Sequence, residues 1–220
     1  MIFYGKRVLF FGAHPDDIEL GCGALIHHIK GMSDLLCVTL SDNQKNPLLK
    51  NVVDEHYKAM EKLGVPKEKV ILGPFTTRIF HDSRQEILEY FLNLRSDFQP
   101  DIIFVHSKQD VHQDHNTMTE EALRAFRGIT LLGFDVVRSS HGFFPHFLVE
   151  VTEEDVNAKI EALSQYETYR DKYYFNNELT RSIMVRHGAL AECPFAEGFD
   201  ILRIVGKFEI CEQRWGMDHG

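Results

Sequence analysis

The chain has 220 residues, of which 44% are hydrophobic, and a formal net charge of -9 at pH 7. This length and composition suit one globular domain with a substantial buried core. The negative charge argues against a surface that neutralises phosphates, so nucleic acid is not expected as the primary partner.

Membrane segments and disulfides are not expected either. No apolar run approaches the ~20 residues that cross a bilayer. The segment MIFYGKRVLFFGAH has its charges too late and its apolar run too short for a secretory signal. The four cysteines form no CxxC pair and are expected to be reduced thiols. We therefore expect a soluble, cytoplasmic protein.

Glycine and proline separate short apolar runs from longer amphipathic segments in the first part of the chain. The apolar runs predict strands buried on both faces of a parallel sheet, at 7–12, 35–40, 70–73 and 101–107. The segments between and after them predict helices at 21–30, 52–63, 83–98 and 115–126. This alternation predicts an α/β fold that is Rossmann-like and doubly wound, with a mainly parallel sheet and helices on both faces.

The pattern changes after Gly128. We expect a strand at 146–152, a helix at 153–169 and a closing strand at 199–210. No flexible linker separates these elements from the rest. We therefore expect a single domain over 1–220, in which 1–127 form the core and 128–220 extend the sheet and wall one side of a pocket.

Two clusters of histidine and aspartate follow predicted strands. AHPDDIELGCG (13–23) leaves the first strand, and HSKQDVHQDH (106–115) leaves the fourth. In open α/β sheets, ligands bind outside the carboxyl ends of the strands. The two segments should therefore bring the following side chains to one rim: His14, Asp16, Asp17, Asp110, His112, Asp114 and His115.

Adjacent carboxylates in a crevice repel each other unless a cation or proton intervenes, and a metal ion resolves this. Imidazole and carboxylate ligands suit zinc, with iron(II) or another divalent ion as alternatives. His14, Asp17 and His115 could form a set of three ligands that leaves a position for water, which is a catalytic arrangement. Each cluster alone has a simpler explanation, because His112 and His115 could share a solvent-facing helix surface and Asp16 could be a helix cap. Two clusters at neighbouring strand ends favour the metal.

AHPDDIELGCGAL and HQDHN resemble the two signatures of the LmbE-like, or PIG-L, family of zinc-dependent de-N-acetylases. Weaker similarity extends through EKLGV, PDIIFV and VTEEDVNAKIEAL. The family includes deacetylases of N-acetylglucosaminyl-phosphatidylinositol, of mycothiol and bacillithiol precursors and of chitooligosaccharides. The resemblance implies that His14, Asp17 and His115 hold the zinc. It also implies that Asp16 is the general base, that His112 polarises the carbonyl or protonates the leaving amine, and that Asp114 orients His112.

The sequence departs from the family where several members carry a TxGExG-like stretch and an arginine, because TLSDNQKNPLLKNVVDEH stands there. We predict that Asn43, after the second strand, and Arg78, in TTRIFHDS, bind the substrate through sugar hydroxyls or a phosphate. A plain polar turn at Asp42 and Asn43 is the alternative. FFPHF (143–147) could supply an aromatic wall for a sugar ring, as could Trp215 if the tail folds back.

The resemblance thus implies removal of an acetyl group from an N-acetylated amino sugar or sugar conjugate, such as a nucleotide sugar or a surface-polysaccharide precursor. The alternative is a zinc hydrolase of the same fold that cleaves another acyl group or a non-sugar amide. A dinucleotide-dependent oxidoreductase is rejected, because GAHPDD stands where G-x-G-x-x-G would be needed. Relatives commonly form homo-oligomers, which this sequence allows.

Overall fold

The computed structural model describes residues 2–43 and 46–206, and the strands of this part form one sheet of seven in the order β3-β2-β1-β4-β5-β7-β6. They are β1 (Arg7–Gly12), β2 (Asp34–Thr39), β3 (Val70–Leu72), β4 (Ile102–His106), β5 (Thr130–Phe134), β6 (Phe147–Glu150) and β7 (Ala196–Arg203). The first five are parallel, and β7 runs antiparallel to both β5 and β6. The predicted Rossmann-like, mainly parallel sheet is confirmed.

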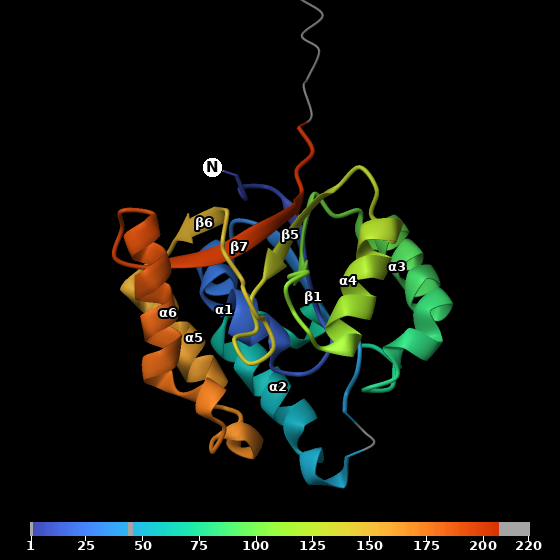
Figure 1. The fold of residues 1–220 in the computed structure, drawn as a ribbon, viewed down its shortest axis with the longest axis horizontal. Helices are drawn as coiled ribbons and strands as arrows, with labels where there is room; N and C mark the ends of the chain where they lie inside the picture. The colour runs from blue at the N-terminus through green and yellow to red at the C-terminus, as the bar shows by residue number, and fades with distance from the viewer. Residues whose placement is uncertain (1, 44–45, 207–220) are drawn as a thin grey trace, which may run out of the picture.

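Helices cover both faces of this sheet. They are α1 (Asp17–Ile29), α2 (Val52–Lys62), α3 (Arg84–Phe98), α4 (Gln113–Ala125), α5 (Glu153–Leu163) and α6 (Asn177–Leu190). Figure 1 shows α3 and α4 on one side of the sheet and α1, α2 and α5 on the other, with α6 against β7. None of the helices in the described part of the chain has the length and apolar character that a membrane span requires.

Each face of the sheet has its own hydrophobic core, which explains the continuous apolar run of β1. Successive side chains of a strand point to opposite faces. Val8 and Phe10 accordingly join the core under α1, α2 and α5, whereas Leu9 and Phe11 join the core under α3 and α4. A strand buried on both faces therefore needs apolar residues at every position.

Several element boundaries differ from the sequence predictions. The helix predicted at 21–30 already begins at Asp17, and the one predicted at 115–126 begins at Gln113. The helix predicted at 153–169 ends at Leu163 and is followed by a 3₁₀ turn, η4 (Glu167–Tyr169). The closing strand runs over Ala196–Arg203. Positions 207–210 of its predicted range lie outside the described residues, as do Cys211 and Trp215. β5 and α6 were not predicted.

The order of the strands creates a crevice between β1 and β4. From β1 the chain proceeds to β2 and β3 on one side, whereas β4 leads to β5 on the other. Such a reversal of strand order is where open α/β sheets bind their ligands. Both sequence clusters leave the carboxyl ends of these two strands, so the fold brings them together.

Candidate active site

The turn between β1 and α1 orients the first cluster. The backbone N–H of His14 donates to Asp17 Oδ2 at 2.8 Å, which fixes the Asp17 carboxylate below the turn. Asp16 has a φ of +105°, a left-handed conformation that costs a residue with a side chain about 1–2 kcal/mol. Its side chain makes no capping hydrogen bond to α1. A capping role therefore does not explain Asp16, and strained backbone of this kind concentrates at functional sites.

Three side chains from the two clusters present one donor atom each at nearly equal separations. His14 Nδ1 lies 3.5 Å from Asp17 Oδ2 and 3.3 Å from His115 Nε2, and the latter two atoms are 3.4 Å apart. A tetrahedral ion with bonds of about 2.0–2.1 Å separates its ligand atoms by about 3.3–3.4 Å. The spacing of these three atoms, which we call the donor triangle, therefore fits an ion of the size of Zn²⁺.

The outer ring nitrogens of the two histidines determine which atoms face this triangle. His14 Nε2 donates to Asp114 Oδ2 at 2.9 Å, and His115 Nδ1 donates to Asp110 Oδ2 at 2.8 Å. The inward nitrogens, His14 Nδ1 and His115 Nε2, then carry free lone pairs. Histidines that bind metals are held by carboxylates in this same way. Two lone pairs and a carboxylate facing one another require a cation or a proton between them.

The pKa values of these side chains show the same preference for positive charge. Burial alone would lower the pKa of His14, but its hydrogen bonds to Asp114 and Asp17 raise it to about 9. Burial also opposes ionisation of Asp17, yet His115 and His106 keep its pKa well below the ordinary range. Burial and the neighbouring His106 lower the pKa of His115 to about 4. At neutral pH, Asp17 is therefore ionised and His115 is neutral, whereas the surroundings of His14 favour a positive charge on its ring.

Asp16 precedes Asp17 in the same turn and interacts electrostatically with Asp17 and His14, but its environment is different. Its side chain is nearly buried, with 8% of the residue exposed. Burial raises the pKa of its carboxyl group well above the ordinary range, and the charges of Asp17 and Glu19 raise it further. A carboxylate whose pKa is shifted upward can accept a proton near neutral pH. Asp16 is therefore suited to the work of a general base.

His112 and Asp114 differ from the expected arrangement. The Asp114 carboxylate binds His14 and accepts the backbone N–H groups of Arg78 at 2.6 Å and Phe80 at 3.3 Å. It does not hold His112. Instead His112 Nδ1 accepts the backbone N–H of Asp114 at 3.2 Å, as the cap of α4. A ring nitrogen of His112 lies within 4.8 Å of those of His14 and His115. His112 therefore adjoins the donor triangle, and Asp114 supports His14 instead.

The loops that carry Asn43 and Arg78 are tied to this site. Asn43 is buried, with a left-handed φ of +58°, and its Oδ1 accepts Thr77 Oγ1–H at 2.6 Å. Arg78 follows Thr77, and its backbone is bonded to Asp114, whereas its side chain is exposed. The structure thus places an exposed arginine on a loop that is bonded to the site, and the substrate contacts of Asn43 and Arg78 remain predictions.

Glu19 and the predicted aromatic wall contribute no atom to the donor triangle. Glu19, two positions after Asp17, is fully buried. Its Oε1 lies 2.8 Å from His56 Nδ1 and 2.5 Å from the hydroxyl of Tyr166, so it joins α1 to α2 and to the segment after α5. In the predicted aromatic wall, Phe144 is 56% exposed.

His106 and Asp110 support the donor triangle, although neither was given a role from the sequence. The ring of His106 stacks on His115 with centroids 3.7 Å apart, and its Nε2 accepts the backbone N–H of Ala13 at 3.3 Å. That nitrogen also lies 3.2 Å from Asp17 Oδ2. Asp110 accepts Ser139 Oγ–H and the backbone N–H of His112, each at 2.8 Å. The sequence signal that could have identified His106 was its position, because it is the last residue of β4.

Comparisons with known proteins identify relatives of this chain in sequence and in fold. The model of the family PIG-L, GlcNAc-PI de-N-acetylase, matches residues 9–126. The deacetylase YaiS of Escherichia coli (strain K12), itself uncharacterised, is 28% identical over 170 residues, which cover 74% of this chain and 91% of that protein. The conserved protein TT1542 from Thermus thermophilus has the same fold, with a TM-score of 0.77, 22% identity and coverage of 92% of this chain and 97% of that one. The N,N'-diacetylchitobiose deacetylase from Pyrococcus horikoshii has a TM-score of 0.69 and 20% identity, with coverage of 90% and 84%.

Proposed function

Because the chain belongs to the PIG-L family and is a deacetylase of that type, we propose that it removes the acetyl group from an N-acetylated amino sugar or sugar conjugate, with a divalent metal ion. The observation that carries the proposal is the triangle of His14 Nδ1, Asp17 Oδ2 and His115 Nε2, at separations of 3.3–3.5 Å, with Asp16 preceding Asp17 in the same turn. Zinc is the proposed ion, and iron(II) or another divalent ion is compatible with the same ligands.

The residues around the donor triangle are proposed to have different roles in amide hydrolysis. A divalent ion at these ligands supplies Lewis acidity, which lowers the pKa of water towards roughly 7 and polarises a carbonyl group. Asp16 accepts the proton of the attacking water, because its raised pKa makes the carboxylate a stronger base than an exposed aspartate. Asp17 cannot take this role, since its carboxylate is held ionised among three histidines.

His112 is proposed to stabilise the oxyanion that forms at the acetyl carbonyl. Burial lowers the pKa of His112, so the ring is neutral at neutral pH. Because its Nδ1 accepts the N–H of Asp114, the neutral ring carries its proton on Nε2 and donates from there. A donor fixed beside a developing negative charge is a strong source of catalysis. This differs from the arrangement that the resemblance implies, in which Asp114 orients His112.

One observation supports a sugar substrate, and a second supports a phosphate group on it. The Pyrococcus protein of the same fold is named for a disaccharide of N-acetylated amino sugars. The exposed Arg78, on a loop that is bonded to the site, suits a phosphate group. This second observation favours a substrate that carries phosphate, such as a nucleotide sugar or a polysaccharide precursor, with Asn43 as a further contact.

Acetate release from a panel of N-acetylated sugars and UDP-sugars tests the proposal, with metal content measured on the same protein. We expect acetate from at least one member, one metal ion per chain, and loss of activity in Asp16→Asn with the metal retained. A chain that binds no metal would refute the ligand assignment. A panel of substrates with other acyl groups tests the alternative function, a hydrolase of other acyl groups or of non-sugar amides. If these substrates are cleaved as fast as the N-acetylated sugars, deacetylation of a sugar is not the main reaction.

A further inference from the structure

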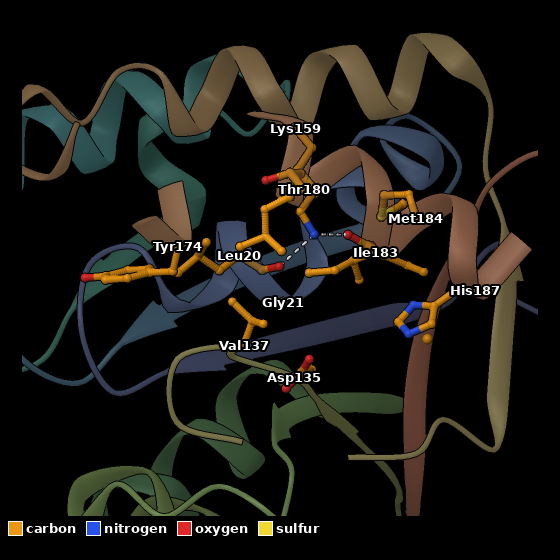
Figure 2. Close-up of a pocket in the computed structure, with 13 residues that line it drawn as sticks. Leu20, Gly21, Asp135, Val137, Lys159, Tyr174, Thr180, Ile183, Met184 and His187 are labelled. Atoms are coloured by element: carbon orange, nitrogen blue, oxygen red, sulfur yellow. Dashed lines mark hydrogen bonds and ion pairs between the residues drawn. The ribbon is translucent and has the colours of Figure 1, made fainter. Parts of the chain in front are cut away.

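A small cavity adjoins the active site on the side of the second half of the chain. It lies between α1, α5, α6 and the start of β7, and we call it the α6 cavity. Its lining includes Asp135, Val137, Lys159, Tyr174, Met184 and His187. Figure 2 shows Lys159 entering from one side and Asp135 and Val137 facing it from the other, with Tyr174 and His187 at opposite ends. Its volume is about 30 Å³, enough for one or two groups of the size of water.

The cavity shares walls with the active site. Leu20 and Gly21, which line it, belong to the same turn of α1 as Asp17. Tyr174 is close enough to Asp16 that, after burial, the charge of Asp16 helps to raise the pKa of the tyrosine to about 12. Phe134, the residue before Asp135, has its ring 4.6 Å from that of His106. The residues that line the cavity are therefore direct neighbours of those that form the active site.

Two buried polar atoms of the cavity have no hydrogen-bond partner among the described residues. They are Asp135 Oδ1 and His187 Nδ1. Such atoms are rare, because burial without a partner costs stability. A Cβ at Gly198 would lie 2.9 Å from the same Nδ1, so the lack of a side chain at Gly198 lets the His187 ring pack closely against β7. Both residues line the cavity, so a polar group bound there is the available partner for these atoms.

Lys159 supplies a donor of the opposite kind. Its Nζ donates to Leu20 O at 2.6 Å and to Glu197 Oε1 at 2.7 Å, as the dashed lines in Figure 2 show. An ammonium group has three N–H donors, so one remains. His187 is neutral at neutral pH, because burial lowers its pKa to about 4. The cavity therefore offers both donors and acceptors.

This combination selects the chemistry of the ligand. The carboxylates of Asp135 and Glu197 would repel an anion such as phosphate, and the ammonium group of Lys159 would repel a cation. A neutral hydroxyl group can donate and accept at once, and the apolar side chains of Val137 and Met184 suit the carbon that bears it. We propose that the α6 cavity is a subsite that binds a hydroxyl-bearing part of the substrate, on the sugar unit next to the one that is deacetylated. This inference rests on the proposed function.

Two substitutions test it with N-acetylglucosamine and N,N'-diacetylchitobiose as probes. We expect Asp135→Asn and His187→Phe each to raise KM for the disaccharide about tenfold, the loss of one hydrogen bond to a fitted group. The kcat for the disaccharide and the kcat/KM for the monosaccharide should change less than twofold. Asp97→Asn, an exposed carboxylate of α3, and Val185→Ala, on the exposed face of α6, are the matched controls and should resemble the wild type.

Calorimetric titration with chitobiose, which has no acetyl group to lose, separates the two proposals. If the wild type releases no acetate but binds chitobiose more tightly than Asp135→Asn and His187→Phe, the proposed reaction fails and the subsite stands. The subsite is refuted if both variants bind chitobiose like the wild type, if the wild type does not bind it, or if both substrates are affected equally. Circular dichroism and melting temperature identify a variant that has not folded, and the other variant then decides.

Discussion

Asp110 is expected to control metal affinity through His115, although it contributes no donor atom to the triangle. Its Oδ2 accepts His115 Nδ1–H and Ser139 Oγ–H, each at 2.8 Å, and its Oδ1 accepts the backbone N–H of His112 at 2.8 Å. Burial opposes its ionisation, yet the bond to His115 lowers the pKa of the carboxyl group. At neutral pH it is therefore a carboxylate with all of these acceptor positions in use.

Asp110→Asn leaves only one accepting oxygen for these donors. If that oxygen serves the backbone of His112, the new amide group turns its own N–H toward His115 Nδ1–H, and two donors then oppose each other. A hydrogen bond to a charged group contributes about 1.5–3 kcal/mol. Since 1.4 kcal/mol corresponds to a factor of ten, metal affinity should fall by about 10- to 100-fold. Partners of metal-binding histidines commonly have effects of this size.

Competition with a chromophoric chelator for Zn²⁺ at neutral pH measures this affinity. Ser139→Ala is the matched variant, because it removes a neutral hydrogen bond from the same oxygen and leaves the charge. We expect it to weaken binding less than about tenfold, since such a bond contributes about 1 kcal/mol. The reasoning is refuted if Asp110→Asn binds Zn²⁺ as tightly as the wild type, or if Ser139→Ala is the more harmful change.

Three further predictions concern the base and two buried groups. Asp16→Asn should retain one metal ion per chain and lower kcat by about 10²–10⁴-fold, as single-turnover assays would show, and near-normal turnover would exclude Asp16 as the base. Glu197→Gln should lower the free energy of unfolding, measured in urea, by about 3–5 kcal/mol, because it leaves the buried Lys159 without its charged partner at 2.7 Å. The control Glu161→Gln, in an exposed pair, should change the free energy of unfolding little, and equal effects of the two variants would contradict this account. The pKa of His187 is about 4 in the folded chain and about 6.5 in the unfolded chain, so between these pH values only the unfolded chain binds the proton. The free energy of unfolding should therefore fall from pH 6.5 to pH 4 by up to roughly 3 kcal/mol. His187→Gln should not show this part of the pH dependence, and parallel stability curves for the two proteins would disprove it.

The elements that the sequence failed to predict are those whose burial does not follow hydrophobic periodicity. In α6 the buried residues are Thr180, Met184, His187 and Gly188, only one of which is a large apolar residue. β5 contains Gly133, which in sequence suggests a turn. In the fold a Cβ at that position would lie 1.9 Å from Asp200 Oδ1 on β7, so the glycine permits the contact between two strands. Both elements depend on partners far away in the chain.

The first half was predictable for the opposite reason. Strands such as β1 must be apolar on both faces, because helices cover both sides of a parallel sheet. The positions of His14, Asp17 and His115 also followed from local rules, since both clusters begin where a strand of such a sheet ends.

The sequence by itself therefore determined the fold class and the residues that gather at one edge of the sheet. Only the tertiary structure decided how those residues pair. Asp114 stands two positions from His112, yet the start of α4 turns its carboxylate toward His14 and the backbone of the loop at Arg78. Asp135 and His187, 52 positions apart by their numbers, line the same cavity only because α6 packs against β7 beside β5. Adjacency in sequence constrains the backbone, whereas the partner of a side chain depends on which elements the fold packs around it.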